Sequence, residues 1–102
     1  MIIPQIKFVF DRKHLASNIK KGVIELRITF NRKQKFITTG VKCFPGEWDD
    51  AHESIRSLSS QEDNAMLMKI RKRALKIIGE MVDAENIDLN AIPSLMIAKV
   101  GF

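Results

Sequence analysis

The side chains best suited to chemistry in this chain are polar residues at alternate positions between Val23 and Asn31. Arg27, Thr29 and Asn31 alternate there with aliphatic and aromatic residues. Alternate residues of a β-strand point to opposite faces of the sheet. Arginine, threonine and asparagine can bond to base edges, and the major groove is wide enough for a two-stranded ribbon. The stretch therefore predicts a hairpin with one apolar face and one face that could contact DNA.

The second strand of this hairpin is predicted over 34–41, with Arg32 and Lys33 as the turn. In that register Phe36 lies opposite Thr29 on the outer face, where it could stack on a sugar or contact a thymine methyl group. A register change of one residue would instead place Phe36 in the core. No Asn-Gly or Asp-Gly pair fixes the turn type, so both placements stay open.

Two further segments complete the predicted sheet and its cover. A first strand is expected over 5–11, and the basic connection 12–22 after it is long enough to be mobile or ordered only by a partner. A helix over about 60–85 is expected to begin with a capping box formed by Ser59 and Glu62. Its apolar stripe consists of Leu67, Ile70, Ala74, Ile77 and Met81, broadened by Met66 and Ile78.

The predicted fold class is α+β, a three-stranded antiparallel β-sheet packed on one long C-terminal α-helix, because a lone sheet needs a cover for its apolar face. Residues 1–86 form the predicted domain, with the sheet over about 5–41 and a connecting turn over 42–58. Trp48 is expected to close one end of the core. The last residues, 87–102, include a short helix near 93–100 and are predicted to be a linker or the start of a following, truncated domain. The apolar side chains there have nothing after them on which to pack.

The chain has a net charge of +5 that is unevenly distributed. Residues 1–48 carry ten Lys and Arg and three Asp and Glu, giving +7, whereas residues 49–102 carry seven and nine, giving −2. The excess on the sheet half favours a polyanion as the partner. A solvated surface that happens to be basic is the alternative. The basic run Lys69–Arg73 could be a second nucleic-acid contact, but such runs more often form the solvated face of a helix.

Other features exclude several classes of protein. The single Cys43 cannot form an internal disulfide, which fits a reducing cytoplasm, and no apolar run approaches the roughly 20 residues that cross a bilayer. His14 and His52 are far apart and lack partners at metal-ligand spacing, and Asp49-Asp50 is expected to serve a turn or cap. We therefore expect a cytoplasmic, non-catalytic protein with no cofactor, no metal, no membrane and no small-molecule substrate.

Several short motifs follow one another along the chain. They are Leu26-Arg27-Ile28, the basic turn Asn31–Lys35, Thr39-Gly40-Val41, Pro45 with Trp48-Asp49, and Asn64 with Leu67 and Ile70. Their order and spacing resemble the N-terminal arm-type DNA-binding domain of phage-integrase-like tyrosine recombinases, closest to those of conjugative transposons and related mobile elements. The stretch 51–60 departs from this pattern because it lacks a basic, glycine-containing turn, which leaves the path of that loop open.

The resemblance implies a three-stranded sheet on one C-terminal helix, with the open face of the sheet binding double-stranded arm or repeat DNA in the major groove. It also implies a module of a recombinase that acts in DNA integration and DNA recombination, in which separate domains would carry the catalytic tyrosine. The chain itself has no tyrosine.

Carried onto this sequence, the resemblance implies two groups of DNA-binding residues. The candidates for direct readout of bases are Arg27, Thr29, Asn31, Gln34, Phe36 and Thr38. The candidates for phosphate contacts are Arg12, Lys13, Lys20, Lys21, Arg32, Lys33 and Lys35. Arginine can bind guanine with two hydrogen bonds, asparagine or glutamine can bind adenine, and lysine suits phosphate oxygens.

Two other functions stay open. One is a protein-interaction module in which a free sheet edge or the C-terminal helix docks other recombinase subunits or an accessory factor; the apolar tail favours it. The other is a small stand-alone DNA-binding regulator. Salt dependence separates DNA from protein partners, since phosphate contacts weaken steeply with salt.

Overall fold

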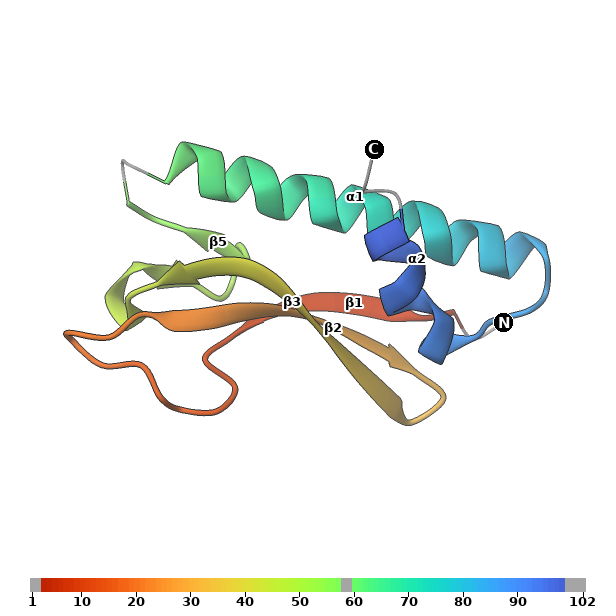
Figure 1. The fold of residues 1–102 in the computed structure, drawn as a ribbon, viewed down its shortest axis with the longest axis horizontal. Helices are drawn as coiled ribbons and strands as arrows, with labels where there is room; N and C mark the ends of the chain where they lie inside the picture. The colour runs from red at the N-terminus through yellow and green to blue at the C-terminus, as the bar shows by residue number, and fades with distance from the viewer. Residues whose placement is uncertain (1–2, 58–59, 99–102) are drawn as a thin grey trace.

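The computed structural model describes residues 3–57 and 60–98. Its centre is an antiparallel sheet whose strands lie in the order β1 (Gln5–Phe10), β2 (Gly22–Phe30) and β3 (Lys33–Cys43). The long helix α1 (Gln61–Asp83) runs along one face of this sheet, and within the described residues no helix covers the opposite face (Figure 1). The predicted α+β class, a three-stranded antiparallel sheet on one long helix, is confirmed.

The turn between β2 and β3 is formed by Asn31 and Arg32, which have positive φ angles of 52° and 65°. Two-residue turns of this kind match the twist of the strands that they connect. The predicted turn, one residue later, was therefore wrong, and Phe36 lies opposite Arg27 rather than Thr29. Because this register differs from the predicted one by two residues, every side chain keeps its face. Phe36 thus lies on the side of the sheet away from α1.

The core lies between the sheet and α1. Ile24, Leu26 and Ile28 of β2 are fully buried there. The predicted stripe of α1 is confirmed, with Leu67, Ala74, Ile77 and Ile78 buried and Ile70 and Met81 partly buried against them. Met66, which was expected to broaden the stripe, is 47% exposed because it lies on the flank of the helix.

Both ends of α1 differ from the prediction. The helix begins directly after Ser60, whose side chain makes no capping hydrogen bond. The predicted cap, Ser59, lies outside the described residues. The helix ends at Asp83, two residues earlier than expected, and the chain leaves it through Glu85 in the left-handed region, with φ at 55°.

The connection 42–58 was expected to be a turn or loop, and the structure contains ordered elements there. β3 extends to Cys43, and the 3-10 helix η1 (Pro45–Glu47) leads into a small hairpin of β4 (Trp48–Asp49) and β5 (Ser54–Ile55). Trp48 is buried and stacks on Phe10 with ring centroids 6.0 Å apart, which confirms its role in closing one end of the core.

The C-terminal segment packs back onto the domain. A 3-10 helix η2 (Leu89–Ala91) leads into α2 (Ile92–Ala98), which contacts α1 (Figure 1). Ile92 is fully buried. Met96, which was expected to have nothing after it on which to pack, is only 7% exposed, so that expectation was wrong for this residue. Whether 87–102 leads into a further domain stays a prediction. Among the described residues, no helix is both long and apolar enough to cross a membrane.

Candidate nucleic-acid interface

We call the sheet surface that points away from α1 the open face. Strand pairing places on it Gln5, Lys7 and Val9 of β1, Val23, Glu25, Arg27 and Thr29 of β2, and Gln34, Phe36, Thr38 and Lys42 of β3. Five of the six predicted readout residues are therefore brought together on one surface. The sixth, Asn31, lies in the turn at its end. On the open face, a shallow hollow of about 390 Å³ lies beside Arg27, Thr29 and Gln34.

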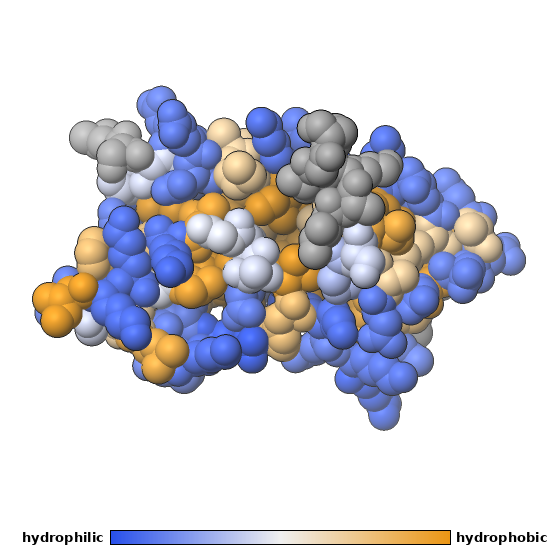
Figure 2. Space-filling view, viewed as in Figure 1, coloured by the Kyte–Doolittle hydropathy of each residue, from blue (hydrophilic) through white to orange (hydrophobic). Residues whose placement is uncertain are grey.

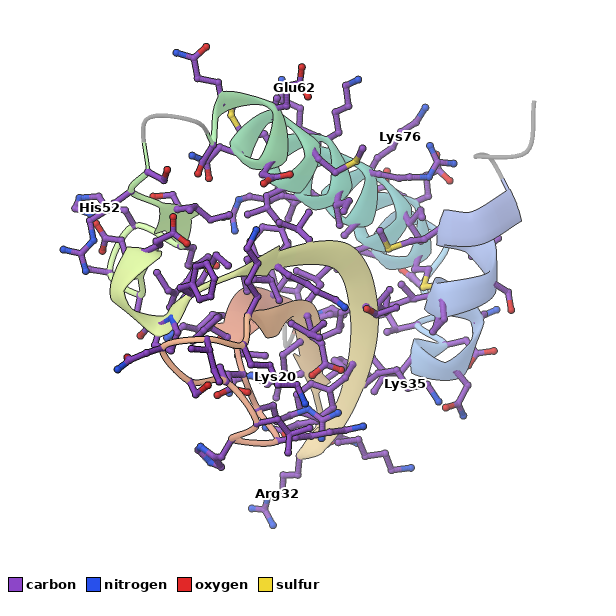
Figure 3. The ribbon with its side chains drawn as sticks, turned by 60° about the vertical axis from the view of Figure 1, so that its left-hand side comes forward. Lys20, Arg32, Lys35, His52, Glu62 and Lys76 are labelled. Atoms are coloured by element: carbon purple, nitrogen blue, oxygen red, sulfur yellow. The ribbon has the colours of Figure 1, made fainter. Side chains whose placement is uncertain are left out.

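The predicted phosphate contacts in and after the β2–β3 turn do not lie on the open face together. Arg32 projects from the far end of the hairpin (Figure 3). Lys33 and Lys35 pair with Phe30 and Ile28, whose side chains belong to the core face, so both lysines lie on the helix side of the sheet. They line a groove with residues 86–90 rather than sharing the open face with Arg27. Lys33 was predicted to lie in the turn itself, and it is the first residue of β3 instead.

The β1–β2 loop, residues 11–21, lies on the open-face side of the sheet (Figure 1). It was expected to be mobile or ordered only by a partner, but hydrogen bonds hold it. The Asp11 carboxylate accepts from the backbone N–H groups of Leu15 at 2.8 Å and Ala16 at 3.1 Å. Ser17 N–H donates to the carbonyl of Lys20 at 2.9 Å. These hydrogen bonds give the loop a defined conformation.

Arg12 connects this loop to the open face. Its Nε and Nη2 atoms donate to the two carboxylate oxygens of Glu25 at 3.0 and 3.1 Å. Its Cζ atom lies 4.0 Å from the centroid of the Phe36 ring. The hydrogen bonds with Glu25 raise the pKa of Arg12 above its ordinary value. Sequence reasoning missed Glu25, although the alternation in β2 places it on the same face as Arg27.

A hollow of about 310 Å³ lies between the loop and the end of the sheet, and its lining includes several lysines together with the acidic residues Asp11 and Glu25. The lysines that line it are Lys13, Lys20, Lys21 and Lys42. Lys20 is labelled beside the β1–β2 loop in Figure 3. The Nζ atom of Lys21 lies 5.5 Å from the centroid of the Phe44 ring. Three of these lysines were predicted phosphate contacts, and the structure gathers them at one end of the open face.

The outer edge of β1 is covered by the β4–β5 hairpin. Glu53 accepts a hydrogen bond from the N–H of Phe8 at 2.7 Å, and Asp50 lies 3.2 Å from Lys7 Nζ. Hydrogen bonds from Lys7 and then Trp48 lower the pKa of Asp50. A charged side chain over an edge strand discourages pairing with another chain. This cover weakens the alternative in which that sheet edge docks a protein.

Positive charge is not confined to the open face. Exposed cations also follow the outer side of α1: Lys69, Arg71, Lys72 and Lys76. Blue, hydrophilic side chains accordingly lie along the helix as well as around the hairpin and loop in Figure 2. Charge alone therefore does not decide which surface meets a polyanion, and the geometry of each surface must be considered.

The residues considered for catalysis form no catalytic cluster in the described part of the chain. His52 Nδ1 lies 2.8 Å from Asp49 Oδ2, and this bond lowers the pKa of Asp49. Asp49 also accepts from the His52 N–H, as expected for a turn residue. Cys43 is buried, and burial raises its pKa to about 11. No group of three or more potential metal ligands occurs among the described residues.

Comparison with known proteins gives one finding. Neither the curated proteins nor the solved structures contain a significant match to the chain. A family model described as the arm DNA-binding domain matches residues 11–92, a span that includes the β1–β2 loop, the hairpin and α1. Since the match covers most of the chain, this protein belongs to the arm DNA-binding domain family and is a non-catalytic DNA-binding module.

Proposed function

We propose that the domain reads double-stranded DNA through its open face, which enters the major groove, and that it is the N-terminal module of a tyrosine-recombinase-type integrase. The observation that carries the proposal is the patch formed by Arg27, Thr29 and Gln34. These side chains lie on adjacent strands, where Thr29 is directly opposite Gln34. No described helix covers them, whereas the opposite face is filled by α1.

The dimensions of a β-ribbon support this mode of binding. Neighbouring strands lie about 4.8 Å apart, and the major groove is about 12 Å wide. Two strands with their side chains therefore fit the groove with Arg27 near the base edges. Arg27 suits guanine and Gln34 suits adenine, since each can form two hydrogen bonds with that base.

The cations around this patch have the position that phosphate contacts need. The β2–β3 turn, which contains Arg32, lies at one end of the open face, and the β1–β2 loop, which contains Lys13, Lys20 and Lys21, lies towards the other (Figure 1). Phosphate contacts fix the register of a protein on the duplex, whereas base contacts select the sequence. Arm or repeat sites of the parent element are the proposed targets, and other recombinase subunits are the proposed protein partners.

The test is a titration of labelled duplexes by fluorescence anisotropy across a salt series. The duplexes are the terminal repeats of the parent element and a scrambled sequence of the same composition. If about five phosphates are engaged, log K should fall against log salt with a slope of about −4 to −5. A shallow slope, or equal affinity for the two duplexes at every salt concentration, would contradict sequence-specific binding.

A matched pair of variants identifies the face. Arg27→Ala removes a cation from the open face, and Lys76→Ala removes one from the outer side of α1. The proposal requires a larger loss of affinity from Arg27→Ala on the repeat duplex. A larger loss from Lys76→Ala would instead identify the basic side of α1 as the DNA-binding surface.

A further inference from the structure

We propose that Arg12 is a positioning residue and not a phosphate ligand: it fastens the β1–β2 loop to the open face, so that the loop forms a preformed second wall that contacts DNA phosphates. The inference rests on the proposed function, because it assigns a role within the same DNA-binding surface. It differs from the sequence-based expectation, in which Arg12 itself binds phosphate.

One edge of the Arg12 guanidinium is already engaged. Its Nε and Nη2 atoms form a bidentate pair with Glu25 at 3.0 and 3.1 Å. The edge of a guanidinium formed by Nε and Nη2 can also bind a phosphate through two parallel hydrogen bonds. One face of the group also lies against Phe36, at 4.0 Å from the ring centroid. To bind a phosphate through this edge, Arg12 would first have to leave Glu25.

The negative charge of Glu25 on the open face needs a positively charged partner. Glu25 is the only carboxylate among the open-face residues defined above, and its side chain is 16% exposed. An unpaired acid in the middle of this surface would repel the DNA backbone, and a partly buried charge that loses its partner is costly. Arg12 neutralises it. The pair therefore makes the face compatible with DNA while it holds the loop.

Phe36 supplies the platform for this pair. The ring was expected to meet a sugar or a thymine methyl group, but Arg12 covers one face of it. A guanidinium stacked on an aromatic ring gains cation–π attraction as well as contact area. Phe36 therefore acts through Arg12, and base readout is assigned to its uncovered neighbours, Arg27 and Gln34.

The rest of the loop is built to hold a fixed shape. Asp11 donates its N–H to the carbonyl of Val23 at 2.9 Å, and its carboxylate caps the turn that follows. Gly22 closes the loop where no larger residue fits, because an added Cβ would lie 2.9 Å from the Cβ of Ala16. With Arg12 bound between these two ends, Lys13, Lys20 and Lys21 are presented together beside the sheet, as a wall along one strand of the duplex.

The experiment compares the 102-residue chain with Arg12→Ala, Glu25→Gln, the double variant and Lys13→Ala as a neighbouring control. Two quantities are measured: amide hydrogen exchange of residues 12–21 without DNA, and duplex affinity across a salt series. Circular dichroism melting confirms that each variant is folded. We expect Arg12→Ala to speed exchange in the loop and to weaken binding about tenfold, with the salt slope unchanged.

The double variant decides between the two roles. If Arg12 neutralises Glu25, the double variant binds more tightly than Arg12→Ala, because no uncompensated acid remains. Lys13→Ala should leave loop exchange unchanged and make the slope shallower by about 0.9, as loss of one phosphate contact does. The inference is overturned if Arg12→Ala changes the slope as Lys13→Ala does, or leaves loop exchange as it was.

Failure of the inference and failure of the proposed function give different results. If the wild-type chain binds neither duplex at low salt, the proposed function and the phosphate wall are both rejected. Loop exchange in Arg12→Ala still shows whether Arg12 fastens the loop. If the wild type binds DNA and the loop exchange of Arg12→Ala equals that of wild type, only the positioning role of Arg12 is rejected.

Discussion

Arg27 of β2 and Phe36 of β3 lie directly opposite each other on the open face. Side chains in such antiparallel pairs have their Cβ atoms about 5 Å apart, close enough to restrict one another. The ring of Phe36 is covered on one side by Arg12. The Phe36 ring therefore limits the directions in which the long side chain of Arg27 can point.

Replacing Arg27 tests direct readout. We expect Arg27→Ala to weaken binding to the repeat duplex by about 1–3 kcal/mol and to weaken binding to a scrambled duplex by less. Arg27→Lys is the matched control, because it keeps the charge but loses the bidentate geometry. It should retain non-specific affinity and lose discrimination. Equal losses on both duplexes for Arg27→Ala would sink the assignment.

Two neighbouring residues of β3 test which face meets the DNA. Gln34 lies on the open face and Lys35 on the helix side. We expect Gln34→Ala to cost about 1–3 kcal/mol on the repeat duplex, since it removes a base contact. Lys35→Ala should have a smaller effect that is the same for every sequence, measured by anisotropy at one salt concentration. A larger loss of affinity from Lys35→Ala than from Gln34→Ala would show that DNA approaches from the side of α2.

The sheet and α1 could be predicted because both depend on local periodicity. Ile24, Leu26 and Ile28 repeat every second residue, and the stripe from Leu67 to Met81 repeats at helical spacing. The face of a β3 residue also depends on the register, and a predicted register that is wrong by two residues leaves that face unchanged. This is why Phe36 was placed on the outer face even though its predicted partner was wrong.

The features that were missed depend on an unusual local turn and on contacts between distant residues. The turn at Asn31 and Arg32 needs two non-glycine residues with positive φ, which no dipeptide signal indicated. The ion pair that joins the β1–β2 loop to β2 needs Glu25, which lies 13 residues after Arg12. Such partners become visible only when the register of the sheet is known.

The hydrogen bonds between Asn64 and Ile55 give a stability prediction. The Asn64 side chain accepts from the Ile55 N–H and donates to the Ile55 carbonyl, both at 2.9 Å. Because Asn64→Ala leaves both backbone groups without this partner, it should lower the free energy of unfolding by about 1–3 kcal/mol. Urea denaturation measures this loss. Gln61→Ala, at an exposed position in the first turn of the same helix, is the control and should change stability little. A similar loss in both variants would contradict a specific role for Asn64.

Two glycines should respond to alanine in opposite ways. At Gly22 an added Cβ would lie 2.8 Å from Phe10 Cε1, so Gly22→Ala should destabilise the domain and disturb the loop. At Gly79, inside α1, an added Cβ meets nothing within 4 Å. Gly79→Ala should therefore stabilise the domain by about 0.5–1 kcal/mol, since alanine favours helix more than glycine does. Thermal melts of the two variants check both signs, and a stabilised Gly22→Ala would show that the end of the loop is not tightly packed.

The buried thiol of Cys43 gives a prediction about pH. Burial, followed by the nearby charge of Glu47, raises its pKa from 9.0 to about 11. The thiolate is the reactive form, so a shift of two pKa units should slow reaction with a disulfide reagent at pH 8 about 100-fold relative to the unfolded chain. Because the folded state keeps its proton longer, the contribution of this group to stability is complete below pH 9 and is lost as the pH rises towards 11. Urea titrations over that range should show stability falling more steeply for wild type than for Cys43→Ala, which lacks the group. Parallel curves for the two proteins would show that the thiol titrates at an ordinary pKa.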